Sequence, residues 1–113
     1  MIRIAQFLLA VTLVFALDVS DAKADDIATI YANRCAFCHG VSGKGDGPAG
    51  VALKPPPRNL ADPEYWKSAN DEALKAVIAN GKPGTAMVAF KDTLSADQIA
   101  ALVEHLKRFN PAH

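Results

Sequence analysis

Two cysteines and a histidine stand close together in the segment RCAFCHG, residues 34–40 of this sequence. Cys35 and Cys38 are the only cysteines in the chain, and His39 follows the second one directly. Two thiols and an imidazole at this spacing can form a redox-active dithiol, bind a metal ion or hold a prosthetic group. The rest of the sequence has to decide among these chemistries.

The dithiol and zinc alternatives need surroundings that the sequence supplies poorly. A thioredoxin-like dithiol belongs beside a βαβ unit and needs no histidine, but the chain shows no strand alternation. Structural zinc needs four ligands, and only the distant His105 and His113 could complete the set. Covalent haem attachment has the pattern C-x-x-C-H, in which two thiols bond the ring and the next imidazole binds the iron. The pattern favours haem, with zinc and dithiol chemistry as rivals.

The first part of the chain is typical of an export signal. Arg3 precedes an apolar run at residues 7–17, and the small residues Ala22 and Ala24 lie two apart beyond it. This order describes a secretory signal peptide, so we expect residues 1–24 to be cleaved after Ala24. The apolar run is shorter than the roughly 20 residues that a spanning helix needs. We therefore expect a periplasmic domain with no membrane span, at residues 25–113.

Charge and size limit what this domain can do. The chain carries 12 Lys and Arg against 12 Asp and Glu. It shows no basic stripe with interleaved aromatic residues, which argues against a nucleic-acid partner. So short a domain buries a limited core and often needs a further constraint, yet a disulfide within C-x-x-C would close only a tiny loop. A buried haem would supply the missing apolar area.

Helical periodicity and breaker residues predict an all-α domain with three to four helices and long loops. A helix running into the cysteine motif should stop at Gly40, and Gly- and Pro-rich chain follows it. Ser95 and Gln98 form a capping-box pattern before the clearest amphipathic stretch. The expected helical segments are residues 25–39, a single turn at 61–66 that is capped by Asp62, then 68–81 and 95–109.

The sixth position on the iron decides between electron transfer and catalysis. Met87 is the only methionine of the expected mature chain, and it lies in a late loop with no helical period. His105 is the competing ligand, but it lies beside the apolar stripe of the last helix, so we expect it to be partly exposed. Ligation by His39 and Met87 would raise the reduction potential and fill both axial sites. This predicts electron transfer.

These motifs resemble those of class I cytochrome c, the small soluble monohaem type of bacteria. The segments CAFCHG, GKGDGP, PPPRNL, YW and ANGKPGTAM, followed by an amphipathic helix, stand in the family's order over residues 25–109. The resemblance implies a cytochrome c fold around one haem that is covalently bound through Cys35 and Cys38. It implies His39 as the proximal ligand of the iron and Met87 as the distal ligand.

The resemblance also implies supporting roles around the haem. It predicts that the carbonyl of Pro48 accepts the N–H of the proximal imidazole, and that Arg58 and Trp66 hydrogen-bond a haem propionate. Tyr31, one helical turn before the motif, should pack the first helix against the last. Many relatives carry proline after the ligand methionine, whereas Val88 stands there in this chain, which should leave the loop less fixed.

The function implied is that of a periplasmic one-electron carrier, an electron-transfer protein and not an enzyme. Its partners would be redox proteins: a dehydrogenase or reductase as donor, and an oxidase or another cytochrome as acceptor. We expect a monomer. Two alternatives stay open: a haem c subunit of a larger oxidoreductase complex, and an open-site haem sensor or peroxidase.

Overall fold

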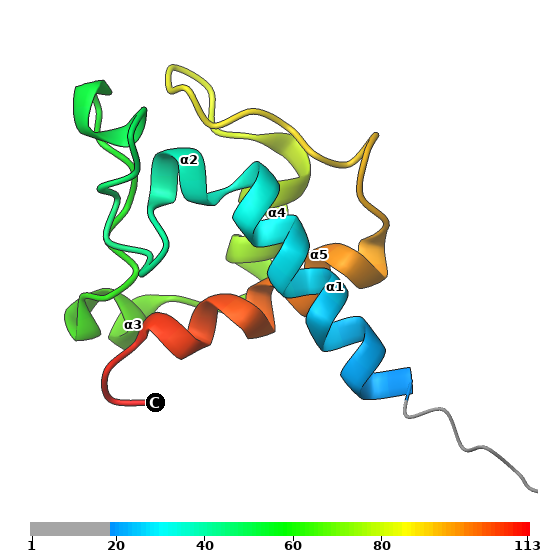
Figure 1. The fold of residues 1–113 in the computed structure, drawn as a ribbon. Helices are drawn as coiled ribbons and strands as arrows, with labels where there is room; N and C mark the ends of the chain where they lie inside the picture. Colours follow the sequence, from blue (N-terminus) through cyan, green and yellow to red (C-terminus); the bar gives the residue numbers. More distant parts are fainter. Residues whose placement is uncertain (1–18) are drawn as a thin grey trace, which may run out of the picture.

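The protein is helical throughout the part that the structure describes. The computed structural model describes the backbone of residues 19–113 and the side chains of residues 26–113, and it has no strand in that part (Figure 1). The predicted all-α class is therefore confirmed. The elements are α1 (Val19–Arg34), α2 (Ala36–His39), α3 (Pro63–Ser68), α4 (Asp71–Asn80) and α5 (Ala96–Leu106), with 3₁₀ turns η1 (Gly50–Ala52) and η2 (Lys107–Phe109).

The predicted leader lies mostly outside the described residues. Its apolar run, residues 7–17, belongs to the part of the chain that is left undescribed. The expected cleavage point after Ala24 falls within α1. Within the described residues, no helix combines the length and the apolar character that crossing a membrane requires.

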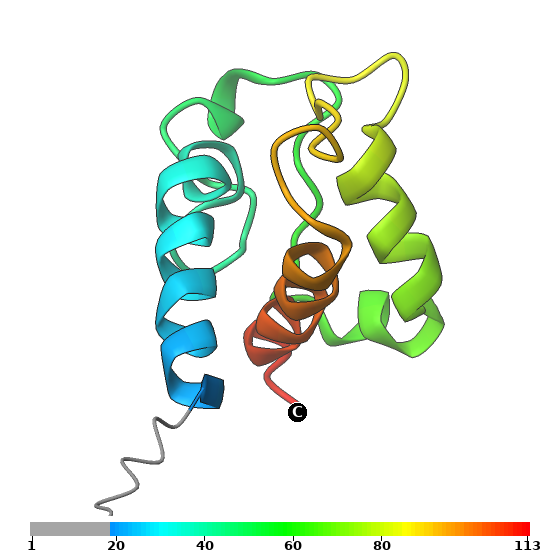
Figure 2. The ribbon, with the colours of Figure 1, turned by 90° about the vertical axis from the view of Figure 1, so that its right-hand side faces the viewer.

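Helix α5 is the centre of the packing. It lies between α1 and α4 in Figure 2, and it contacts both. Leu102 and Val103 of α5 are the most deeply buried side chains of the described part. The neighbouring helices cover them with an apolar face each: Ile27 and Tyr31 of α1, and Leu74 and Ile78 of α4.

Side-chain caps fix where three of these helices begin. The Asp62 carboxylate accepts the backbone N–H of Glu64 at 3.0 Å, with Pro63 as the first residue of α3. Ser95 and Gln98 form both hydrogen bonds of a capping box at the start of α5. The Asn70 side chain accepts the backbone N–H of Ala73 at 2.8 Å and caps the start of α4. Such caps contribute about 1 kcal/mol each, and the predictions at Asp62 and Ser95 are confirmed.

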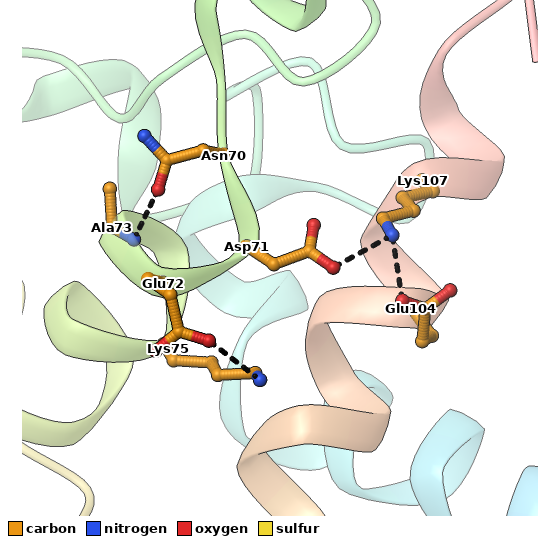
Figure 3. Close-up of polar contacts among 7 residues, drawn as sticks. All are labelled: Asn70, Asp71, Glu72, Ala73, Lys75, Glu104 and Lys107. Carbon is orange, nitrogen blue, oxygen red and sulfur yellow. Dashed lines mark hydrogen bonds and ion pairs between the residues drawn. The ribbon is translucent and has the colours of Figure 1, made fainter.

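Ion pairs join the start of α4 to the end of α5 (Figure 3). Lys107 lies between the carboxylates of Asp71, at 3.1 Å, and Glu104, at 2.7 Å. Lys75 pairs with Glu72 within α4 at 3.2 Å. These groups are partly or largely exposed, so solvent screens each pair and its contribution to the stability of the fold is small.

An aromatic cluster holds α1 against the end of α5. The Tyr31 ring lies 5.3 Å from the His105 ring and 5.2 Å from the Phe109 ring, measured between centroids. This confirms that Tyr31 packs the first helix against the last. The expectation for His105 was wrong, because its side chain is only 9% exposed. The chain tightens into η2 after α5 and brings Phe109 against the imidazole, at 6.0 Å, which covers it.

Candidate haem-binding site

One large cavity brings the predicted haem ligands together. Its volume is about 820 Å³, within the usual range for cofactor sites. Cys35, Cys38 and His39 line one side of it, and Met87 lines it from a loop 48 residues later in the chain. Residues from α1, α2, α4, α5 and the loop before α3 complete the walls.

The walls have the chemistry that a haem needs. Leu60, Leu74 and Leu102 belong to the buried core and also line the cavity, so a group bound there would rest on the core itself. Arg34, Arg58 and Lys82 line it as well, while no Asp or Glu does among the described residues. An apolar interior with cations at the edge matches a flat apolar ring that carries carboxylates. The residues present therefore fit a haem.

His39 lines this cavity and is half-buried. Its Nδ1 atom has no hydrogen-bond partner among the described residues. Burial lowers the pKa of the imidazole below its ordinary value, and a backbone hydrogen-bond contact with Arg58 partly opposes this. A buried polar atom without a partner costs about 1–3 kcal/mol.

The predicted partner of His39, Pro48, does not reach it in this structure. Pro48 is exposed and does not line the cavity, and the described residues include no hydrogen bond between it and the imidazole. The backbone of Arg58 faces His39 instead.

The loop after α2 is pressed tightly onto the cysteine motif. The N–H of Gly47 donates to the carbonyl of Cys38 at 3.1 Å, and the N–H of Ala49 donates to the carbonyl of Phe37 at 2.9 Å. A Cβ atom at Gly50 would overlap the Cys38 carbonyl, and one at Gly47 would overlap the carbonyl of Phe37. Glycine at both positions therefore allows this contact.

The two cysteines are free thiols beside the cavity. Both are half-buried, and no disulfide joins them. Burial raises the pKa of Cys35 to about 11, with a smaller opposing effect from Arg34. The Cys35 thiol therefore stays protonated at neutral pH, and a protonated thiol is a poor nucleophile for disulfide exchange. This disfavours the redox-dithiol alternative.

Met87 reaches the cavity from the Met87 loop, residues 81–90. The N–H of Lys82 donates to the Met87 carbonyl at 3.1 Å, and the N–H of Met87 donates to the Thr85 hydroxyl oxygen at 3.2 Å. His105, the competing ligand, does not line the cavity. The described residues contain no cluster of three or more His, Cys, Asp or Glu that could hold a metal ion, which disfavours zinc.

The residues expected at a propionate differ in how the structure places them. Arg58 lines the cavity, and its guanidinium lies 5.1 Å from the centre of the Tyr65 ring. The Trp66 indole N–H donates to the Leu60 carbonyl at 2.7 Å, and Trp66 does not line the cavity. The propionate role of Trp66 therefore stays a prediction. The hydrogen bond to Leu60 counts against it. Its neighbour Tyr65 lines the cavity, and nothing in the sequence tells which of two adjacent aromatic residues faces inward.

Comparison with known proteins agrees with this site. Residues 22–106 match the family described as cytochrome C oxidase, cbb3-type, subunit III. None of the curated proteins that were compared matches the chain.

Solved structures give the same result. The KustC0563 c-type cytochrome is 30% identical, with a TM-score of 0.62 over 74% of this chain and 95% of that one. The c-type cytochrome NirC is 26% identical, with a TM-score of 0.59 over 80% of this chain and 96% of that one. A Kuenenia stuttgartiensis reducing HAO-like protein complex, Kustc0457/Kustc0458, is 28% identical, with a TM-score of 0.66 over 78% of this chain and 43% of that one.

Proposed function

The chain belongs to the c-type cytochromes, and from this membership we propose that it is a periplasmic one-electron carrier. The family binds haem c covalently, and Cys35 and Cys38 are the residues that would hold it. The observation that carries the proposal is the single cavity lined by both thiols, the His39 imidazole and the Met87 thioether. The C-x-x-C-H motif lies early in the domain and the proposed methionine ligand lies late in it. This order also favours class I among the c-type cytochromes.

The side chains of the cavity would act on the two faces and the edge of the ring. His39 and Met87 would be the two protein ligands of the iron, which would leave no open position for a substrate. Such ligation raises the reduction potential. When bound, the haem supplies an iron that alternates between the ferric and ferrous states. Leu74, Leu102 and their apolar neighbours exclude water, and Arg58 would hold a propionate by a charge-assisted hydrogen bond.

A second candidate is a haem c subunit of a larger redox complex. The description of the matching family names a subunit of an oxidase, and one similar structure belongs to a protein complex. The site chemistry would be the same in both cases. Purification from the native host separates them, because a carrier is recovered alone and a subunit is recovered with its partners. An open-site sensor or peroxidase is disfavoured because Met87 lines the cavity with His39.

Replacing the proposed distal ligand tests the carrier function. In protein matured with covalent haem, Met87→Ala should allow the ferrous form to bind carbon monoxide at neutral pH and should lower the midpoint potential. Val88→Ala is the matched control, because it truncates the next side chain of the same loop and removes no ligand. Carbon monoxide binding by the unmodified protein, or an unchanged spectrum and potential in Met87→Ala, would contradict His39/Met87 ligation.

A further inference from the structure

Leu60 is fastened by both of its backbone polar groups. Its N–H donates to the Gly43 carbonyl at 2.7 Å, and its carbonyl accepts the indole N–H of Trp66, also at 2.7 Å. The Leu60 side chain is only 4% exposed, belongs to the core and lines the cavity. Leu60 therefore joins three parts at one point: the loop that follows the cysteine motif, helix α3 and the wall of the cavity.

The segment just before Leu60 has few other attachments. Residues 55–57 are three consecutive prolines, which have no backbone N–H to donate. Arg58 follows them, and its exposed side chain lines the cavity. The Pro57 carbonyl packs closely against Gly45, where a Cβ atom would meet the carbonyl oxygen at 2.6 Å. The position of Arg58 thus depends on this contact and on the two hydrogen bonds of Leu60.

Arg58 is the charged residue that this attachment places at the cavity. Its guanidinium lies 5.1 Å from the centre of the Tyr65 ring, and its backbone faces the His39 imidazole. It takes part in no ion pair within residues 26–113. Its charge is therefore not neutralised at short range, and it can act on a group that is bound in the cavity.

Tyr65 and Trp66 are neighbours in α3 but face different surroundings. Tyr65 lines the cavity, whereas Trp66 does not and packs against the core. Their rings lie edge to face, with centroids 5.4 Å apart. Trp66 therefore supports Arg58 in two ways, through the Leu60 backbone and through the Tyr65 ring on which the guanidinium rests.

The indole of Trp66 has a single hydrogen-bonding group. Its Nε1–H is a donor, and the ring offers no acceptor. The bond to the Leu60 carbonyl already uses this donor. The structure thus gives Trp66 an attachment to the loop that carries Arg58, and it leaves no second polar group for a ligand in the cavity.

We propose that Trp66 is a positioning residue of the haem site, which keeps the Arg58 guanidinium at the cavity by holding the Leu60 carbonyl and the Tyr65 ring. A cation beside a haem favours the ferrous state, because the ferric iron carries one more positive charge. Trp66 therefore raises the reduction potential without contacting the bound group. The proposal rests on the proposed electron-transfer function of the same cavity.

A double-mutant cycle on the redox equilibrium tests whether Trp66 acts through Arg58. Trp66→Phe keeps an aromatic ring but removes the N–H, and Arg58→Gln removes the charge but keeps a long polar side chain. The holoproteins are equilibrated with a mediator of fixed potential, and the ratio of ferrous to ferric protein is measured. Each single variant should shift this ratio about threefold toward the ferric form, since Arg58 is exposed and its charge is partly screened.

The double variant decides between an indirect and a direct role. In the Arg58→Gln background, Trp66→Phe should change the ratio less than about 1.5-fold, because the charge that Trp66 positions is already gone. A combined shift of about ninefold would show that the two residues act independently. That result would overturn the proposal, because Trp66 would then act on the haem by itself.

The matched control loses a hydrogen bond between a side chain and the backbone at another place. Ser95→Ala removes the bond from the Gln98 N–H to the Ser95 hydroxyl, and neither residue lines the cavity. It should lower the urea midpoint of unfolding to a similar extent as Trp66→Phe, but it should leave the ratio of ferrous to ferric protein unchanged. Equal shifts of this ratio in the two variants would contradict the proposal, because loss of stability would then suffice.

The unmodified holoprotein allows a test that needs no variant. Trp66 is the only tryptophan of the sequence, so its indole N–H resonance is identified directly in the diamagnetic ferrous form. This proton should show nuclear Overhauser effects to Leu60 and Ala61 and none to the propionate methylene protons of the haem. Effects to those methylene protons would overturn the proposal. A missing or high-spin haem spectrum would instead contradict the proposed electron-transfer function, and it is seen before any variant is made.

Discussion

The two sides of the cavity are held in place by different means. The proximal side, residues 35–50, is fastened to its surroundings: Tyr31 donates a buried hydrogen bond to the Gly40 carbonyl at 2.7 Å, and the N–H of Leu60 donates to the Gly43 carbonyl at 2.7 Å. The distal side, the Met87 loop, is bonded mainly within itself and to the end of α4. Most of its residues from Lys82 to Val88 are exposed.

This difference assigns different tasks to the two ligands. The backbone around His39 is set by contacts that the folded chain makes on its own, so the proximal imidazole is positioned in advance. Met87 stands on a segment whose backbone is bonded mainly within itself and to the end of α4, and Val88 after it adds no proline constraint. We therefore expect the distal bond to be the weaker and more easily replaced of the two.

The largest effect should come from removing the covalent attachment. Cys35→Ala/Cys38→Ala removes both thioethers, so haem should be lost from the purified protein under denaturing conditions. Met87→Ala, on the other side of the cavity, should keep its haem under the same conditions. A haem-stained denaturing gel and the mass of the intact protein measure this. Covalent haem in the double cysteine variant would show that the attachment site is wrong.

Glycine substitutions compare the tightness of the two sides directly. Gly50→Ala would push a methyl group into the Cys38 carbonyl, and overpacking of this kind costs about 2–3 kcal/mol. Gly84 has φ +77°, but a Cβ atom there would meet nothing within 4 Å. Gly84→Ala should therefore cost only about 1 kcal/mol, from backbone strain. Denaturant unfolding of the two holoproteins gives both values, and equal costs would remove the proposed asymmetry.

Removing one hydroxyl group should also give a small effect. Tyr31→Phe keeps the ring in the aromatic cluster but deletes the hydrogen bond to Gly40, which should cost about 1 kcal/mol. Burial, and secondarily the charges of Cys35 and Asp46, raises the pKa of this phenol above its ordinary value.

The sign of this shift predicts a pH dependence. The folded protein favours the neutral phenol, so the stabilisation is complete below the ordinary phenol pKa of about 10. It is lost as the pH rises further, because only the unfolded state then ionises readily. The free energy of unfolding should fall less steeply above pH 10 in Tyr31→Phe than in the unmodified protein. Parallel curves would show that Tyr31 does not titrate in this way.

The sequence predicted the elements whose signals are local. Capping depends only on residues that are close in sequence, and Asp62 and Ser95 cap the helices as predicted. The C-x-x-C-H motif is equally local, and its two cysteines and its histidine line the cavity. Longer-range packing was not predictable in the same way. His105 is buried because η2 brings Phe109 against it, and Trp66 is turned to Leu60 while Tyr65 faces the cavity. Both depend on how distant segments meet.

The distribution of charge in space also could not be predicted from the sequence alone. A formal net charge of zero predicts weak electrostatic effects only if opposite charges are mixed in space. The fold instead pairs the lysines of α3, α4 and η2, while Arg34, Arg58 and Lys82 beside the cavity take part in no ion pair within residues 26–113. Composition alone therefore underestimates the field at the cavity.

The most direct test of the central claim is the absorption spectrum of the ferric holoprotein at neutral pH, matured in a host that attaches c-type haem. Ligation by His39 and Met87 predicts a low-spin, six-coordinate spectrum with a weak thioether-to-iron charge-transfer band that disappears in Met87→Ala. A high-spin spectrum in the unmodified protein would mean an open iron, and it would contradict the assignment of this cavity to electron transfer.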